Sequence, residues 1–151
     1  MSFFLRSQVF VEGGTIPSRH TCDGLSLSPP LSWGGAPAGT QSFVLVVEDP
    51  DAPGGTFIHW VLMDIGAKVT ALPEGQPAAR LGIAGINDFG KSAYGPPCPP
   101  RGKGAHRYVF TLHALDLPSV GLGPGATLVQ LNQKLSGHIL ATVKLIGKYG
   151  R

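Results

Sequence analysis

The chain has 151 residues, of which 42% are hydrophobic and 14% are charged, and its formal net charge at pH 7 is +3. This length suits a single domain spanning residues 1–151, and the composition excludes an intrinsically disordered chain. The basic residues are scattered rather than grouped in a run, so we expect no nucleic-acid partner. No apolar stretch is long enough to cross a membrane, and no signal peptide is recognisable, so we expect a cytoplasmic protein without a transmembrane segment.

The chain contains 22 glycines and 14 prolines, which separate short runs rich in Val, Ile and Phe. Frequent turn residues between such runs favour an all-β sandwich or barrel over a helical bundle. In chain order, strands are predicted at residues 3–11, 31–33, 42–48, 56–64, 68–72, 81–86, 106–116 and 139–146, with a surface loop at 73–77. The clearest of one or two short helices is predicted at 127–136, where Thr127 and Gln130 form a capping box.

Two acidic residues and a histidine flank the turn between the two most apolar predicted strands. Asp49 and Asp51 follow the first strand, and His59 lies near the start of the second. The prolines and glycines between them, including Pro53, interrupt strand pairing. Two carboxylates and an imidazole could therefore share one end of a sheet, although either Asp alone could equally cap a turn.

A second informative stretch is the connection at residues 91–105, which we call the proline loop. It is about as long as unstructured connections become in a compact domain, and such long loops are usually functional. Its four prolines restrict the backbone, which favours a preformed pocket wall. The loop leads into a predicted strand whose more apolar face carries His106 and Tyr108.

His59 and His106 both lie near the starts of apolar strands, which makes them candidates for one site. A nearby carboxylate would fix the tautomer of each ring and favour its protonated form, so that each ring would donate to an anion. Phosphate or a carboxylate is the natural ligand, and Arg101, Lys103 and Arg107 would favour its approach. Structural histidines and solvated surface charges are the alternative interpretation.

Other kinds of chemistry have weaker support. A transition-metal site is chemically allowed, but no compact ligand motif accompanies its candidate ligands, which are Asp49, Asp51, His59 and His106. The segment at residues 24–28 lacks the second Gly of a nucleophile elbow, which disfavours a hydrolase. We therefore expect no catalytic residue, no metal and no cofactor, and a hydrolase or metal-dependent enzyme is the alternative.

Cys22 and Cys98 are the two cysteines of the chain. They are too few for a disulfide framework, and they lack the CxxC spacing of zinc and redox sites. In the cytosol we expect both to be reduced, with a disulfide between their Pro- and Gly-rich loops as the alternative.

Three segments together resemble the phosphatidylethanolamine-binding protein family, in its bacterial Raf-kinase-inhibitor-like branch. They are HTCDGLSLSPPLSW at residues 20–33, VVEDPDAPGGTFIHWVL at 46–62 and YGPPCPPRGKGAHRYVF at 94–110. These segments occur in family order within a match from about residue 16 to residue 149. The resemblance implies a Greek-key β-sandwich with a small pocket for phosphate-like anions and phospholipid headgroups.

The resemblance also implies roles for single residues. Motif positions give as the ligand-binding set Asp49, Asp51, His59, Pro100, His106 and Tyr108. Pro53, Cys98 and Arg107 are supporting residues, and we expect Arg107 to pair with a carboxylate of the acidic turn rather than with the ligand. The chain departs from many bacterial relatives at Arg101 and Lys103, which make the expected rim more basic.

We therefore predict a non-enzymatic protein that binds phosphate or a phospholipid headgroup. The resemblance further suggests inhibition of a protein kinase or a protease, and a homodimer as in some bacterial relatives. A protein-interaction domain with a vestigial pocket is another alternative.

Overall fold

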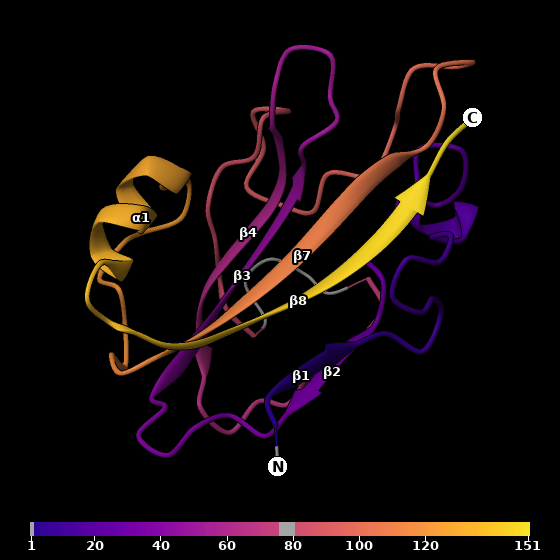
Figure 1. Cartoon of the computed structure of the whole chain (residues 1–151). Helices are drawn as coiled ribbons and strands as arrows, with labels where there is room; N and C mark the ends of the chain where they lie inside the picture. Colours follow the sequence, from indigo (N-terminus) through magenta and orange to yellow (C-terminus); the bar gives the residue numbers. More distant parts are fainter. Residues whose placement is uncertain (1, 76–80) are drawn as a thin grey trace.

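The computed structural model describes residues 2–75 and 81–151. Within these residues the chain forms two β-sheets, one α-helix and a short 3₁₀ helix (Figure 1). The smaller sheet has the order β1-β2-β5, with strands β1 (Phe4–Arg6), β2 (Leu31–Gly34) and β5 (Ala71–Leu72). The larger sheet has the order β6-β4-β3-β7-β8, with strands β6 (Ile83–Ala84), β4 (Phe57–Gly66), β3 (Ser42–Asp49), β7 (His106–Leu115) and β8 (Ile139–Tyr149).

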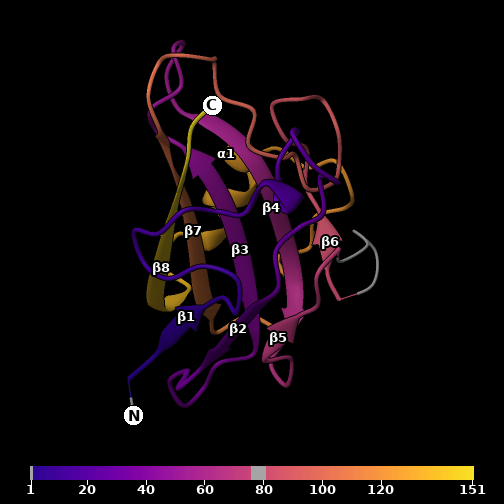
Figure 2. The ribbon, with the colours of Figure 1, turned by 90° about the vertical axis from the view of Figure 1, so that its right-hand side faces the viewer.

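The central strand β3 is apolar along most of its length because both of its faces are covered. Phe43, Leu45 and Val47 enter the core between the two sheets. Val44 and Val46 enter a second core on the opposite face of the large sheet. Figure 2 shows the small sheet in front of the large sheet and α1 (Leu128–Leu135) behind it. This arrangement explains why β3 reads as a continuous apolar run rather than as an alternating pattern.

The helix α1 forms where the sequence predicts it. The Thr127 hydroxyl accepts a hydrogen bond from the backbone N–H of Gln130 at 3.1 Å, and the Gln130 side chain accepts one from the backbone N–H of Thr127 at 2.9 Å. Leu131 and Leu135 are buried in the second core. Capping and burial of one face together stabilise this short helix.

Several predicted boundaries differ from the observed ones. The strand predicted at residues 3–11 ends at Arg6, and the Ser7 hydroxyl then donates to the Pro30 carbonyl at 2.7 Å. The last strand extends to Tyr149 because that residue pairs with His106. The 3₁₀ helix (Ser18–His20) was not predicted. Part of the predicted loop at 73–77 lies outside the described residues.

The antiparallel pairing of the large sheet determines which residues meet at its end. Asp49, the last residue of β3, pairs with Phe57 of β4. His106, the first residue of β7, pairs with Tyr149 of β8. These strand ends lie together at the upper end of the sheet in Figure 1. None of the helices in the described part of the chain has the length and apolar character that crossing a membrane requires.

The burial of β7 leads to a stability prediction. Leu112→Ala removes a side chain with no exposed surface, and we expect it to lower the free energy of unfolding by about 2–5 kcal/mol because it leaves a cavity. Val129→Ala, at a side chain that is 68% exposed, should change it by less than about 0.5 kcal/mol. Urea denaturation without reductant measures both values. Equal losses in the two variants would contradict the assignment of Leu112 to the core.

Candidate functional site

A cavity of about 230 Å³ lies at the end of the large sheet where β3 ends and β7 begins. Of the expected site residues, its wall contains Asp49, Pro53, His59, Cys98, Pro100, His106 and Tyr108. Ala52, Phe57, Phe89 and Pro99 complete it. The structure therefore brings the acidic turn, two strand ends and the proline loop to one place.

Asp49 and His106 form a buried pair in the cavity wall. The Nδ1 of His106 donates to Oδ2 of Asp49 at 2.7 Å. The other carboxylate oxygen of Asp49 accepts the backbone N–H of Asp51 at 2.8 Å, as in an Asx turn. The carboxylate thus fixes the tautomer of His106, and Nε2 is the ring nitrogen left for a ligand.

His59 is held in a different way from the expected one. Its Nδ1 donates to the carbonyl of Gly95 at 2.8 Å, while the Gly95 N–H donates to the His59 carbonyl at 2.8 Å. Burial lowers the pKa of His59 below its usual value, and this effect outweighs the nearby carboxylates that raise it. The expectation of a carboxylate-oriented ring is therefore wrong for His59, and burial disfavours its protonated form. Its neutral form presents the lone pair of Nε2 rather than a proton.

Asp51 and Arg107 form an ion pair that lies outside the lining of the cavity. Arg107 donates from Nε and Nη2 to the two carboxylate oxygens of Asp51 at 2.9 and 2.8 Å, and its backbone N–H donates to the same carboxylate at 2.9 Å. These bonds hold the pKa of Asp51 well below its usual range. The pair joins the acidic turn to the start of β7, which is the supporting role expected for Arg107. Asp51 contacts Arg107 and not the cavity.

Tyr108 brings an unusual polar group to the cavity wall. Its side chain is 1% exposed, and its hydroxyl has no hydrogen-bond partner among the described residues. Burial raises the pKa of Tyr108, so the phenol stays protonated and remains a donor. Buried hydroxyls in native proteins are usually hydrogen-bonded, so this group is suited to a ligand atom.

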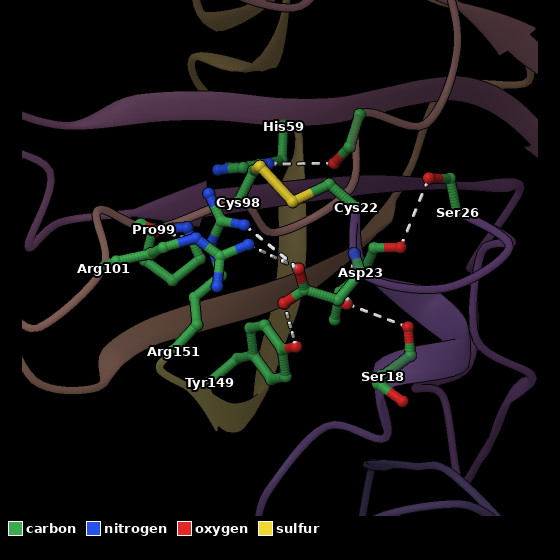
Figure 3. The surroundings of a disulfide bond; sticks show 12 residues. Ser18, Cys22, Asp23, Ser26, His59, Cys98, Pro99, Arg101, Tyr149 and Arg151 are labelled. Carbon is green, nitrogen blue, oxygen red and sulfur yellow. Dashed lines mark hydrogen bonds and ion pairs between the residues drawn. A yellow bond between two sulfur atoms is a disulfide. The ribbon is translucent and has the colours of Figure 1, made fainter.

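Cys22 and Cys98 form a disulfide, which corrects the expectation of reduced thiols (Figure 3). The pairing joins the proline loop to the coil at residues 17–30, which we call the N-terminal coil. The two segments also share hydrogen bonds from the Cys22 N–H to the Pro97 carbonyl at 3.1 Å and from the Tyr94 hydroxyl to the His20 carbonyl at 2.7 Å. Sequence alone does not show that these segments, 76 positions apart at their cysteines, lie side by side.

Phe89 is a cavity residue that the sequence analysis missed. Its ring packs edge-on against Phe57, with ring centroids 4.8 Å apart, and against His59 at 5.5 Å. The side chain of Asn87 accepts the N–H of Phe89 at 2.9 Å and thereby shapes the turn. Gly95 leaves room for the ring, because a Cβ there would lie 2.3 Å from it. The Asn-Asp-Phe-Gly turn was recognised, but the direction of its aromatic side chain was not.

The two basic residues expected at the rim do not line the cavity itself. Arg101 and Lys103 are exposed and fall outside the lining of the cavity. Arg101 lies 3.8 Å from the Asp23 carboxylate. Across residues 2–75 and 81–151, no group of three or more His, Cys, Asp and Glu side chains is arranged to hold a metal ion.

A larger cavity of about 520 Å³ lies beside β2 and β5. Its charged lining residue is Glu74, which is already paired with Arg19 through two hydrogen bonds of 2.7 and 2.9 Å. The smaller cavity is therefore the better candidate, because it combines two imidazoles, a carboxylate and a phenol.

Known proteins resemble nearly the whole of this chain. A sequence model described as phosphatidylethanolamine-binding protein matches residues 6–150. A UPF0098 protein of Aquifex aeolicus is 49% identical over 100% of this chain and 89% of its own length. A crystal structure of the phosphatidylethanolamine-binding protein homologue CT736 of Chlamydia trachomatis has a TM-score of 0.92 and 39% identity, and it covers 99% of this chain and 98% of its own.

Two further relatives widen the comparison. The crystal structure of Escherichia coli YbcL, described as a member of the mammalian family, has a TM-score of 0.91 and 32% identity over 100% of this chain and 99% of its own. LppC of Mycobacterium tuberculosis, named as a candidate lipoprotein, is 38% identical over 96% of this chain and 71% of its own length. That name bears on the location of LppC and leaves the cytoplasmic location of this chain a prediction.

The Asp51–Arg107 pair leads to a prediction about acid stability. Because the folded pKa of Asp51 is depressed, the pair stabilises the fold above the unfolded pKa of about 3.9 and loses its effect as the pH falls further. We expect Arg107→Gln to lower the free energy of unfolding only slightly at neutral pH, since both side chains are partly exposed to solvent. The difference from the unmodified chain should shrink in acid. Urea denaturation across this pH range measures it, and a difference that is constant with pH would contradict the pairing.

Proposed function

The chain belongs to the phosphatidylethanolamine-binding protein family, and from this premise we propose that its cavity binds a small phosphate-type anion without converting it. The observation that carries the proposal is the Tyr108 hydroxyl, a buried donor without a partner among the described residues. A buried donor that makes no hydrogen bond costs about 1–3 kcal/mol, and an anion oxygen would satisfy it.

The Asp49–His106 pair gives the cavity a second donor. Asp49 alone would repel an anion, but a proton shared with His106 makes the pair neutral overall and leaves Nε2–H of the protonated ring directed away from Asp49. The pair therefore suits an anion that binds together with a proton.

His59 also makes the binding of an anion depend on a proton. Its Nδ1 proton is committed to Gly95, so the neutral ring offers only an acceptor to a ligand. An oxyanion that retains one acidic proton would donate to this nitrogen, and a fully ionised one would bind only after the ring takes up a proton. In both cases, binding at neutral pH is coupled to a proton.

The size of the cavity favours a substituted anion. Its volume of about 230 Å³ corresponds to roughly eight water molecules at ~30 Å³ each, which is more than the five heavy atoms of phosphate need. A phosphomonoester, whether free or as a lipid headgroup, shares the required chemistry. Titration with phosphoethanolamine and with vesicles that carry this headgroup would separate the two sources.

Other parts of the expected function stay predictions. Inhibition of a kinase or a protease and assembly into a homodimer concern surfaces beyond the cavity. An enzyme that uses the same residues stays the alternative, and turnover of a phosphomonoester that is lost in His106→Gln would favour it over simple binding.

Phosphate titration of Tyr108→Phe tests the central observation. We expect binding to weaken by roughly ten- to hundredfold, because a hydrogen bond to a charged group is worth about 1.5–3 kcal/mol. The free energy of unfolding should not fall, because the variant removes a buried hydroxyl that has no partner among the described residues. His113→Gln serves as the control, since that ring lies on the other face of β7 and bonds to Thr142 at 2.8 Å. Unchanged affinity in Tyr108→Phe, measured by calorimetry, would refute the proposal.

The pH dependence of binding provides a second test. Sulfate is the probe because it does not titrate near neutral pH. Since burial lowers the pKa of the free His59 ring, we expect sulfate binding to take up protons and to weaken as the pH rises from about 6 to about 8. Calorimetry in buffers of different ionisation enthalpy measures the uptake. Affinity that rises with pH would contradict protonated imidazoles as the anion donors.

A further inference from the structure

The wall of the cavity is attached to the N-terminal coil at two adjacent residues, Cys22 and Asp23. We call residues 97–100 the wall segment. Cys22 is bonded to Cys98 through the disulfide, and its N–H donates to the carbonyl of Pro97. Asp23 accepts from Nη1 of Arg151 at 3.0 Å, and Nε of Arg151 donates to the Pro99 carbonyl at 2.8 Å. Figure 3 shows Asp23, Pro99 and Arg151 beside the disulfide.

The sequence of the wall segment makes these attachments important. Prolines occupy positions 97, 99 and 100 and have no N–H, so they cannot donate to a neighbouring strand. In the described part of the chain, the wall segment accepts two hydrogen bonds through its carbonyls and is joined to the N-terminal coil by the disulfide. The disulfide is therefore the strongest of few constraints on this side of the cavity.

The turn at residues 18–24, which we call the anchor, is held by several contacts other than the disulfide. The Thr21 hydroxyl donates to the Ser18 carbonyl at 2.8 Å and accepts the Asp23 N–H at 3.2 Å. Gly24 packs so closely that a Cβ there would lie 2.3 Å from the Ser18 carbonyl oxygen. The Tyr149 hydroxyl donates to the Asp23 carboxylate, and this bond and Arg151 keep the pKa of Asp23 low and its charge in place. Release of the disulfide would therefore free the wall segment rather than the anchor.

The disulfide is open to chemical attack from solvent. Cys98 is exposed, whereas Cys22 is half-buried. Thiol–disulfide exchange requires that a thiolate reach one sulfur in line with the bond, and exposed disulfides are the reducible ones. The same exposed residue forms part of the cavity wall. A change in the redox state of the pair would thus act directly on the cavity.

We propose that Cys22 and Asp23 are positioning residues of the anion site and that reduction of the Cys22–Cys98 disulfide lowers the affinity of the site. This inference rests on the proposed function. A thiolate of a dithiol attacks Sγ of Cys98, and Cys22 leaves as a thiolate and takes up a proton. The second thiol of the reductant then releases Cys98. The two cysteines gain two electrons and two protons, and the dithiol becomes a disulfide.

The physical cause is the loss of preorganisation. In the oxidised protein the wall segment holds its shape before the ligand arrives. In the reduced protein, part of the binding free energy must order the wall segment. We expect the dissociation constant for phosphate to rise by roughly tenfold, which corresponds to about 1.4 kcal/mol. The rigid N-terminal coil makes the change reversible, because Cys22 stays near its partner.

The test is a calorimetric titration with inorganic phosphate of the oxidised, the dithiothreitol-reduced and the re-oxidised protein. A thiol assay confirms the state of each sample. We expect weaker binding after reduction and recovery after re-oxidation. Irreversible damage to the protein would not allow this recovery. The double variant Cys22→Ser/Cys98→Ser should bind weakly and should not respond to dithiothreitol.

Asp23→Asn tests the second positioning residue with the disulfide intact. It removes the charge that holds Arg151. We expect weaker phosphate binding in the oxidised protein and a larger loss of affinity after reduction. Glu74→Gln is the matched control, because it breaks the ion pair of the same coil through Arg19, neither residue lines the smaller cavity, and the affinity should stay unchanged. Hydrogen exchange gives a readout without ligand. The Gly102 N–H, bonded to the Arg151 carbonyl at 2.7 Å, should exchange faster after reduction and in Asp23→Asn.

The outcomes separate this inference from the proposed function. Equal phosphate affinity and equal exchange in the oxidised and reduced proteins would overturn the inference and leave anion binding intact. An oxidised protein that binds neither phosphate nor sulfate would overturn both. Should reduction unfold the chain, unchanged affinity in oxidised Asp23→Asn would still refute the positioning role.

Discussion

The antiparallel register of β3 with its two neighbours is the constraint on which the site depends. It places Asp49 opposite Phe57, and it brings the first residue of β7 to the same end of the sheet. The hydrogen bond of 2.7 Å between Asp49 and His106 then closes that end. A shift of one position in this register would turn every side chain of β3 to the other face and would separate the two partners. The site is thus a product of the same pairing that builds the core.

The two cavity histidines show how different surroundings give the same kind of side chain different chemical properties. His106 faces a carboxylate, whereas His59 faces a backbone carbonyl and is buried enough for its pKa to fall. The Nδ1 proton of one ring is thus held by a carboxylate, and that of the other by a backbone carbonyl. In the proposed function, this difference would couple the charge of the ligand to its proton content at a site with one carboxylate among its described lining residues. The phenol of Tyr108 completes the set with a donor that does not titrate near neutral pH.

Local patterns predicted much of this arrangement. The apolar runs gave the long strands, and the capping box at Thr127 located the helix, because both signals depend on neighbouring residues. The motifs that resemble the family gave His59, His106 and Tyr108. The sequence analysis did not predict the ring orientation of His59, the disulfide or the position of Phe89. Each of these depends on contacts between segments far apart in the chain, such as His59 with Gly95, which no local pattern encodes.

The position of Arg151 has a practical consequence for handling the protein. Its side chain holds the Pro99 carbonyl, and its own carbonyl accepts from Gly102 at 2.7 Å, so the end of β8 and the cavity wall share one surface. The N-terminus lies at the opposite end of the molecule (Figure 1). A purification tag fused after Arg151 would begin beside the wall segment and compete for its contacts. A tag placed before Ser2 would leave that surface as it is, which makes it the better choice for any ligand measurement.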